Sequence, residues 1–347
     1  MGNILIYCIN RREARNRGDQ LISASLEKYL AASGHQVASL EYLGPALGGR
    51  LPAWMRGILA RIDSSIIGIY VKILFVVFYR QPAIYVLGGG QLLRANSTFP
   101  HAMLAWAIVM RLRNIPLILH SVGFDVEAGA GWVHRVGLKR LCKAATAISV
   151  RDEYSRKYLQ EMGFSNAKVV PDVVFLNSPN SWSLNHSSAS GIVVFVSQFL
   201  LDDNRVQGGF LSLEAYFRRL RELVLGDVLP GEIITVTYSS DSDSSCARMF
   251  AEWLAGEKSL SVAVNYVSVE SVDEFIGVIR GARHIVSTRM HPIIVAKLFG
   301  VKFSVVPFNK KTEDMANSLK TIGLQNLIDD SRDAIDFEIA SVRKQAN

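Results

Sequence analysis

Short, continuous apolar runs alternate with helix-like stretches along almost the whole chain, and no other feature of the sequence restricts the fold as much. Polar residues do not interrupt the runs at every second position, which is typical of strands buried on both faces of a parallel sheet. Most of the intervening stretches have helical periodicity; residues 19–33, for example, carry an apolar face and end at Gly34. The predicted strands are residues 3–9, 35–42, 83–89, 116–123, 146–152, 167–173, 191–197, 232–239, 261–268, 283–289 and 301–307. The sequence therefore predicts an α/β protein with parallel sheets.

A segment rich in Ser, Asn and Pro interrupts this alternation once, at residues 176–190 (LNSPNSWSLNHSSAS). We therefore expect two doubly wound, Rossmann-like domains. The first would cover residues 1–178, a linker residues 179–190, and the second residues 191–330, followed by a C-terminal helix or tail over residues 331–347. Ligands of doubly wound sheets bind beyond the carboxyl ends of the strands, so we look for site residues at those ends.

Composition restricts the kind of partner that we expect the protein to bind and the cellular compartment in which we expect it. The formal net charge is +7 and the sequence pI is about 9.3, which favours anionic partners. Lys and Arg form no block interleaved with aromatic residues, so we do not expect nucleic-acid binding. The three cysteines, Cys8, Cys142 and Cys246, are far apart, and this spacing predicts buried thiols in a reducing compartment rather than disulfides or a metal site. The N-terminus has no signal-peptide pattern, so we expect a cytoplasmic protein.

Residues 54–80 are very apolar, yet they carry five charged side chains. Their uncharged run, residues 64–71, is far shorter than the roughly 20 residues needed to span a membrane. The segment is either a buried helix of the first domain or an amphipathic helix lying on an anionic membrane surface. Its tryptophan, its basic flanks and the positive net charge favour peripheral contact with the inner face of the plasma membrane.

Three loops follow predicted strands of the first domain. Asn16 and Asp19 belong to the sequence NRGD, where Asp19 is a candidate N-cap and free amides could face an anion. Three glycines at 88–90 would let the backbone approach a ligand, although their spacing fits neither a P-loop nor a dinucleotide fingerprint. Asp125 ends the loop SVGFD, whose polar residues lie beyond another strand.

Arg151 and Asp152 follow the predicted strand that ends in AISV. A guanidinium group at the mouth of a parallel sheet offers a planar fork for a carboxylate or a phosphate. Asp152 could orient this arginine or cap the following helix, and the pair could also be purely structural. Because Asp172 stands at the end of the next strand, we favour a binding role.

The stretch VSTRMHPIIVAKLFGVKF, residues 286–303, places Arg289 and His291 where a buried strand passes into a helix. Pro292 suits the first turn of that helix. The helix amides, the guanidinium group and a protonatable imidazole would form one electropositive pocket that binds a phosphorylated anion and moves a proton. Lys310 and Lys311 add cations after the next strand.

Together these pieces resemble the polysaccharide pyruvyl transferase family, from about residue 3 to about residue 325. The matching pieces are NRGDQLI, YVLGGGQLL, HSVGFD, ISVRDEYSRKYLQEMGF with VVPDVVF, and IVSTRMHPIIVAKLFGVKFSVVPFNKK. The resemblance implies an architecture similar to that of GT-B glycosyltransferases, with the ligand in an interdomain cleft.

The resemblance also implies that phosphoenolpyruvate is the donor and co-substrate, without a further cofactor or a metal. The acceptor would be a glycan or an undecaprenyl-linked oligosaccharide, two hydroxyls of which receive a pyruvate ketal while phosphate is released. His291 and Arg289 would be catalytic, with His291 acting either on the enol carbon or on the departing phosphate. The residues expected to hold the donor are Arg151, Arg289, Lys310 and Lys311, and those expected to line the acceptor side are Asn16, Asp19, Gly89, Gly90, Asp125 and Asp172.

Two other functions remain compatible with the sequence. A GT-B-type glycosyltransferase would use a nucleotide sugar, and Glu313 and Asp314 could serve its donor pocket. A non-catalytic assembly protein of polysaccharide synthesis would hold an acceptor without reacting, and the presence of Arg289, His291 and Arg151 argues against it.

Overall fold

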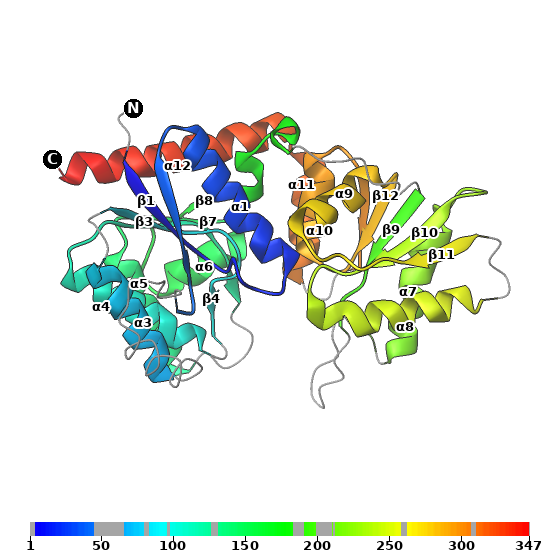
Figure 1. The fold of residues 1–347 in the computed structure, drawn as a ribbon, viewed down its shortest axis with the longest axis horizontal. Helices are drawn as coiled ribbons and strands as arrows, with labels where there is room; N and C mark the ends of the chain where they lie inside the picture. The colour runs from blue at the N-terminus through cyan, green and yellow to red at the C-terminus, as the bar shows by residue number, and fades with distance from the viewer. Residues whose placement is uncertain are drawn as a thin grey trace. The chain divides into compact units, whose positions relative to one another are not determined.

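A computed structural model of the 347-residue chain describes the positions that can be placed. These are residues 4–44, 66–79, 83–95, 98–125, 131–182, 191–198, 210, 212–257, 262–306 and 310–346. The chain divides into two compact units, shown in Figure 1. Unit 1 consists of residues 1–13, 22–177 and 327–347, and unit 2 of residues 14–21 and 178–326.

Unit 1 is built on a six-stranded sheet with the order β2-β1-β3-β5-β7-β8, in which neighbouring strands run parallel. Its strands are β1 (Leu5–Asn10), β2 (Gln36–Glu41), β3 (Ile84–Gly88), β5 (Leu117–Val122), β7 (Ala147–Val150) and β8 (Lys168–Val169). Two short strands, β4 (Leu93–Arg94) and β6 (Phe124–Asp125), pair with each other separately. The central strands β3 and β5 are buried along their whole length, because helices cover both faces.

Helices of unit 1 form two layers, one on each face of the sheet (Figure 1). α1 (Arg17–Ala32) and α12 (Leu324–Ala346) lie on one face, and α3 (Ile66–Tyr79), α4 (Phe99–Leu112) and α5 (Trp132–Ala144) on the other. Residues of alternate parity along β1, β3 and β5 pack against the second layer to form a large apolar core. α6 (Glu153–Glu161) and the 3-10 turn Val173–Leu176 complete the unit.

Unit 2 has a five-stranded parallel sheet with the order β11-β10-β9-β12-β13. The strands are β9 (Gly191–Phe195), β10 (Ile233–Thr237), β11 (Ala263–Tyr266), β12 (His284–Ser287) and β13 (Lys302–Val305). The helices are α7 (Leu213–Leu225), α8 (Ser244–Ala255), α9 (Val272–Gly281), α10 (Met290–Leu298) and α11 (Lys310–Thr321), with 3-10 turns at Pro179–Ser181 and Asp241–Asp243. Because strand order reverses beside β9, this is a doubly wound sheet of the Rossmann type.

The predicted α/β class with two doubly wound sheets is confirmed, and each of the eleven predicted strands has a counterpart. Unit 1 runs to Asn177 and unit 2 resumes at Ser178, beside the predicted linker at 179–190; of that linker, residues 183–190 lie outside the described residues. Helix α12 begins at Leu324 and continues to Ala346, and its Asp336 accepts a hydrogen bond from Tyr29 of α1.

The apolar segment at 54–80 is described only from Ile66 to Tyr79, where it forms α3. Ile69, Ile73 and Val77 recur at four-residue spacing, and all three are buried in the core of unit 1. One face of α3 is therefore part of the core of unit 1. Within the described residues, no helix combines the length and the apolar character that crossing a bilayer requires. Contact of this segment with a membrane surface stays a prediction.

Candidate active site

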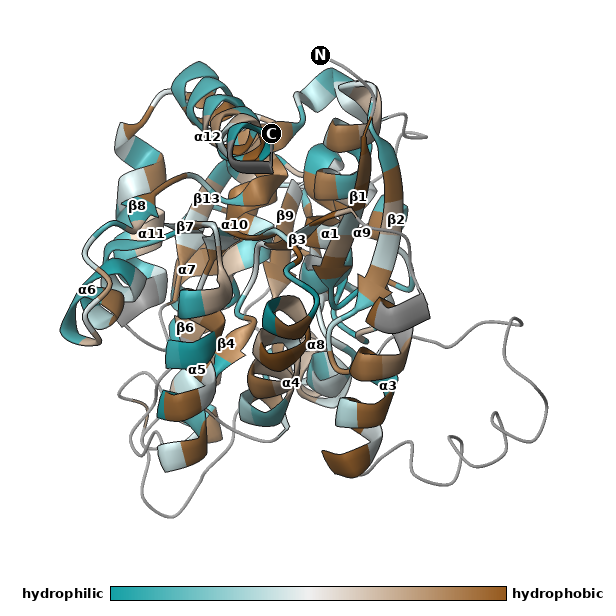
Figure 2. Ribbon diagram, turned by 90° about the vertical axis from the view of Figure 1, so that its left-hand side faces the viewer, coloured by the Kyte–Doolittle hydropathy of each residue, from teal (hydrophilic) through white to brown (hydrophobic). Residues whose placement is uncertain are grey.

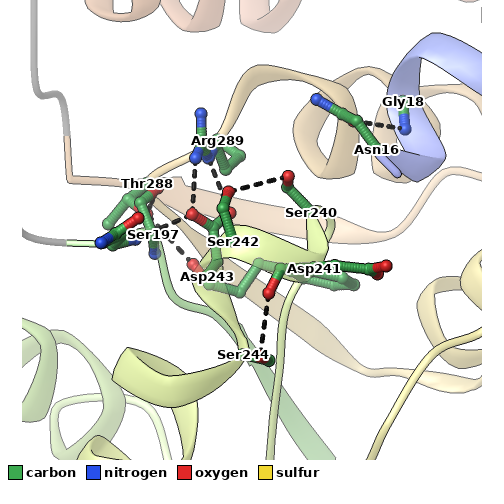
Figure 3. Close-up of polar contacts among 12 residues, drawn as sticks. Asn16, Gly18, Ser197, Ser240, Asp241, Ser242, Asp243, Ser244, Thr288 and Arg289 are labelled. Carbon is green, nitrogen blue, oxygen red and sulfur yellow. Dashed lines mark hydrogen bonds and ion pairs between the residues drawn. The ribbon is translucent and has the colours of Figure 1, made fainter. Parts of the chain in front are cut away.

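The carboxyl ends of β9 and β12 lie side by side where the strand order of unit 2 reverses, which is the position at which doubly wound sheets bind ligands. The loops leaving these two ends are joined by hydroxyl groups (Figure 3). The Oγ atom of Ser197 lies 2.6 Å from Oγ1 of Thr288, and the Ser197 N–H donates to the same oxygen at 3.0 Å. The backbone before Arg289 is thereby fixed at the edge of the sheet.

Arg289 is held along one edge of its guanidinium group by Asp243, as Figure 3 shows. Nε donates to Oδ2 at 3.0 Å and Nη2 donates to Oδ1 at 2.6 Å. The Asp243 side chain is fully buried and also accepts the N–H of Gln198 at 2.9 Å, whereas the Arg289 side chain is 40% exposed. Among the described residues Nη1 has no partner. The guanidinium plane is therefore oriented by a buried carboxylate and presents its other edge outward, as a fork that could bind an anion.

His291 is the second residue of α10, for which Arg289 is the N-cap. Its imidazole ring packs directly on the backbone of Gly18. A Cβ atom at position 18 would lie 2.2 Å from Nδ1 and 2.5 Å from Cγ of the histidine. Only glycine permits this approach, so the NRGD loop sets the position of the histidine ring.

The NRGD loop is anchored in unit 2 by Arg17, which is buried. Its N–H donates to the carbonyl of Ser239 at 2.7 Å, Nε to the carbonyl of Val269 at 3.1 Å, and Nη2 to Asp241 at 2.9 Å. Asn16 pairs with Ser240 in an isolated β-bridge. Three hydrogen bonds from one buried side chain and its amide make this loop a fixed part of the site.

Asp19 was a candidate N-cap of the first helix, and that prediction is wrong. The helix begins at Arg17, which puts Asp19 in its first turn. Instead, Asn16 Oδ1 accepts the N–H of Gly18 at 2.9 Å. The helix starts two residues earlier than the apolar pattern suggested because the asparagine satisfies a free amide at its start.

The sequence SSDSDSS at 239–245 is the part of the site that sequence reasoning missed. It follows β10, forms the 3-10 turn Asp241–Asp243 and leads into α8. Asp241 binds Arg17 and Asp243 binds Arg289. A run of serines and aspartates directly after a buried strand was the available signal, since such residues are favoured in turns and at helix starts.

In unit 1, Arg151 is packed inside the protein. Its side chain is fully buried, Nη1 donates to Asp172 at 3.1 Å, and Asp172 in turn accepts the N–H of Val174 at 3.2 Å. The guanidinium group lies against Gly123, where a Cβ atom would come within 2.7 Å of Nε. Asp152 caps α6 by accepting the N–H of Ser155 at 2.7 Å. Arg151, which follows β7, therefore joins the loop after β8 through Asp172 and packs against the loop after β5 at Gly123.

The glycines after β3 are buried and have left-handed backbones, with φ of 71° at Gly89 and 70° at Gly90. The Gly89 N–H donates to the carbonyl of His120 and the Gly90 carbonyl accepts the N–H of Gly123. A Cβ atom on Gly89 would collide with Ile22 and Val173 at 2.6 Å. Glycine is thus required at position 89 by close packing within unit 1.

The remaining predicted residues are placed less completely. Asp125 lies in β6 opposite Arg94, and its side chain lies outside the described part of the structure. Lys310 and Lys311 begin α11, and their side chains also lie outside the described part of the structure. The structure brings Arg289, His291 and Asn16 into unit 2, and Arg151, Asp172, Gly89 and Gly90 into unit 1, as two separate groups.

The described residues contain no group of three or more His, Cys, Asp or Glu side chains that could hold a metal ion. Burial raises the pKa of the Tyr216 phenol, so this group stays neutral where its oxygen donates to the Ser197 carbonyl. The charged side chains of the unit 2 site include two ion pairs, Arg289 with Asp243 and Arg17 with Asp241.

Solved structures with a similar fold include UDP-N-acetylglucosamine 2-epimerases. A UDP-GlcNAc 2-epimerase from Methanocaldococcus jannaschii superposes with a TM-score of 0.54 at 10% identity, covering 97% of this chain and 99% of that one. A putative UDP-N-acetylglucosamine 2-epimerase from Listeria monocytogenes gives 0.57 at 12% identity, covering 96% and 88%. One from Rickettsia bellii gives 0.51 at 11% identity, covering 99% and 98%. At such identities the likeness concerns the fold alone, which is of the GT-B type with two Rossmann-like units.

The family follows from the sequence. The model of the polysaccharide pyruvyl transferase family matches residues 16–308, and the chain belongs to that family, as its motifs predicted. A search of curated proteins found no match. The family match includes the NRGD loop, Arg151, Arg289 and His291, so both groups of predicted site residues lie inside it.

Proposed function

We propose that this protein transfers the enolpyruvyl group of phosphoenolpyruvate to two hydroxyls of a sugar, forming a pyruvate ketal and releasing phosphate. The observation that supports this best is the pairing of Arg289 with the buried Asp243. It leaves one edge of the guanidinium fork open at the ligand-binding edge of unit 2. Such a fork suits the phosphate or the carboxylate of phosphoenolpyruvate. Membership of the polysaccharide pyruvyl transferase family makes a transferase of this kind the expected activity.

The chemistry needs one proton and two oxygen nucleophiles. A proton is added to the methylene carbon of the enol, and positive charge develops at C2. One sugar hydroxyl forms a C–O bond to C2 and loses its proton. The bond between C2 and the phosphate oxygen then breaks, and the second hydroxyl forms a C–O bond to C2 and loses its proton, which is matched by the proton with which phosphate leaves. His291 would supply or accept a proton in this sequence, and Arg289 would stabilise negative charge on the phosphate.

Two neighbouring groups would keep these side chains in position. Asp243 fixes the plane of the Arg289 guanidinium through two hydrogen bonds. Gly18 allows the histidine ring to lie against the loop anchored by Arg17. Geometry held in this way lowers the barrier because little rearrangement is left for the reaction itself.

Arg151 is a different case. We predicted that it binds the donor, and that stays a prediction. Its complete burial and its bond to Asp172 favour a role in positioning the loops of unit 1 over direct contact with substrate. The expected acceptor-side role of Asn16, Asp19, Gly89, Gly90, Asp125 and Asp172 likewise remains a proposal, as does the interdomain cleft.

The acceptor would be a surface glycan or its lipid-linked precursor, met at the cytoplasmic side of the membrane. The test is release of phosphate from phosphoenolpyruvate by the full chain, measured with a panel of aryl or lipid-linked sugars. We expect release that depends on the acceptor and falls at least a hundredfold in His291→Ala. His101→Gln, a partly exposed histidine of α4 in unit 1, is the control for histidine loss. Release that is equal in His291→Ala and wild type would contradict the assignment.

A second candidate is an enzyme acting on a nucleotide sugar. It is favoured by the fold, since the similar solved structures are UDP-GlcNAc 2-epimerases, and one from Neisseria meningitidis is described as bound to UDP-GlcNAc (TM-score 0.52). Calorimetric titration of UDP-sugars and of phosphoenolpyruvate separates the two functions. Tight binding of a UDP-sugar with no phosphate release from phosphoenolpyruvate would favour this second function.

A further inference from the structure

The positive charge of the protein is concentrated in the helical layer α3–α4–α5 and its connections. Residues 66–144 contain nine Lys and Arg and two Asp and Glu, a net charge of +7, which equals the net charge of the whole chain. Both acidic residues, Asp125 and Glu127, lie in the connection between β5 and α5. The helices α3, α4 and α5 themselves carry no acidic residue. This layer is therefore strongly cationic.

The same layer exposes apolar side chains on its outer side. On α4, Leu104, Ile108 and Leu112 recur at four-residue spacing opposite the buried face; Leu112 is 67% exposed, Ile108 is 36% exposed, and Leu104 is partly covered. On α3, Ile67 is 66% exposed, and Val71 follows one turn later on the face opposite Ile69 and Ile73. α3 and α4 are adjacent, since the rings of Tyr70 and His101 meet edge to face at 6.1 Å. Figure 2 shows both helices coloured largely as hydrophobic.

The neighbouring helix α5 has an outer face of a different kind. It begins with Trp132, whose side chain is 69% exposed. Lys139, Arg140 and Lys143 follow and are all exposed. Helix α5 packs against α4, so an apolar surface on two helices continues into a basic surface on the third. Tryptophan beside a basic stripe is the composition of surfaces that lie at the boundary between lipid headgroups and acyl chains.

From this juxtaposition we propose that the outer face of α3, α4 and α5 docks on a bilayer containing anionic phospholipids. Ile67, Leu112 and the partly exposed Ile108 would enter the interface to a shallow depth, and the cations of α5 would bind headgroup phosphates. Charge complementarity favours a lipid surface over a neutral protein partner, because no carboxylate on these helices offsets the cations. The proposal does not depend on pyruvyl transfer.

The test is sedimentation of the full chain with vesicles of phosphatidylcholine alone or mixed with phosphatidylglycerol. We expect binding only to the mixed vesicles and weakening as salt is raised. Each cation near an anionic bilayer contributes about fivefold to affinity, so Lys139→Gln with Arg140→Gln should weaken binding about 25-fold. Lys320→Gln, an exposed cation on α11 in unit 2, is the control and should change nothing.

The apolar half is tested separately by Ile67→Ser with Leu112→Ser. Both positions are about two thirds exposed, at 66% and 67%, so the circular dichroism spectrum and the urea midpoint should stay unchanged while vesicle binding falls about tenfold or more. Leu229→Ser, also exposed but in unit 2, is the matched control. Equal binding to vesicles with and without anionic lipid, or no vesicle binding, would overturn the proposal. So would variants that abolish self-association of the chain and leave vesicle binding intact, since the face would then contact a second copy.

Discussion

Arg151 of unit 1 and Arg289 of unit 2 look alike in the sequence and differ in the structure. Each follows a strand of a parallel sheet, and each is bonded to an aspartate. Arg151 is fully buried and makes one hydrogen bond to Asp172, whereas Arg289 makes two to Asp243 and remains 40% exposed. The comparison teaches that an arginine at a strand end can either join loops inside the protein or present a charge to a ligand. The exposure of its free edge decides between the two roles.

The largest effect is expected when the exposed fork is removed. Arg289→Gln should lower kcat/KM for phosphoenolpyruvate by about 10²- to 10³-fold, because a charged donor to the phosphate is lost. Arg289→Lys should fall between this variant and wild type, since an ammonium group cannot bind Asp243 and an anion in one plane. Steady-state phosphate release measures both. Arg280→Gln, an exposed arginine at the end of α9, is the control. If Arg289→Gln kept full activity, Arg289 would not present its charge to the substrate, and the contrast with Arg151 would not hold.

Replacement of the buried Arg151 should instead lower the stability of the folded protein. Arg151→Met leaves Asp172 buried and uncompensated, which should lower the free energy of unfolding by about 3–5 kcal/mol. Urea denaturation of the full chain measures this. The double variant Arg151→Met with Asp172→Leu should recover part of the loss, because the fully buried Asp172 carboxylate is removed as well, while Asp152, 3.8 Å from Nε of Arg151, still caps α6. A stable Arg151→Met that has lost activity would instead place Arg151 in contact with substrate.

Two glycines, Gly18 and Gly123, allow the positions of the His291 ring and of the Arg151 guanidinium to be tested separately. A Cβ at Gly18 would push the His291 ring, and a Cβ at Gly123 would push the Arg151 guanidinium. We expect Gly18→Ala to lower kcat about 10- to 100-fold with little change in stability. Gly123→Ala should lower stability by about 1–3 kcal/mol.

Gly256→Ala is the matched control for both glycines, because its Cβ would make only ordinary contacts at 3.5 Å. Kinetics and urea midpoints should be measured on all three variants. If Gly18→Ala lost stability and kept kcat, the glycine would serve packing and not the position of the histidine.

The smallest effect concerns a third arginine, Arg283, at the other end of β12. It donates to Asp227 and Glu232, while Lys302 also donates to Asp227 at 2.5 Å. The Lys302 hydrogen bond holds the pKa of Asp227 below its ordinary value, and the Arg283 hydrogen bond lowers the pKa of Glu232. Both carboxyl groups are charged more readily in the folded protein, so their contribution is complete above their unfolded pKa and is lost as pH falls through the folded pKa.

Thermal unfolding at a series of pH values from about 7 to about 3 checks this contribution. Asp227→Asn should be slightly less stable than wild type near neutral pH, and the difference should shrink on acidification. A constant difference across the series would mean that the ionised carboxylate contributes nothing to stability.

Much of the fold was predictable because each central strand is a continuous apolar run, which leaves few alternatives to a covered parallel sheet. The pair β4 and β6 was missed because two residues per strand leave no periodic signal. The packing partner of α12 was also unpredictable. Glu338 of this helix lies 2.8 Å from His120, and an amphipathic pattern does not say which sheet a helix covers.

The residues of the candidate site likewise fall into those that the sequence predicts and those that it does not. Arg289 and His291 were found because a strand, a polar pair and a proline follow one another within a few residues. Asp243 was not found, although it determines how Arg289 is oriented, because the two residues are 46 positions apart. Local motifs reveal residue types at strand ends, whereas their partners come from other loops that only the folded chain brings near.

The division of the chain between its units limits how the protein could be taken apart. The chain passes between unit 1 and unit 2 after Glu13, before Ile22, after Asn177 and before Leu327. No single cut therefore yields two complete halves. A fragment ending at Asn177 would remove Arg17 and Gly18 from the site of unit 2 and would lack α12, whose Glu338 binds His120. Each unit is compact in space, but neither unit is one continuous stretch of the sequence. Gene fusion or exchange at a single junction therefore could not replace either unit intact.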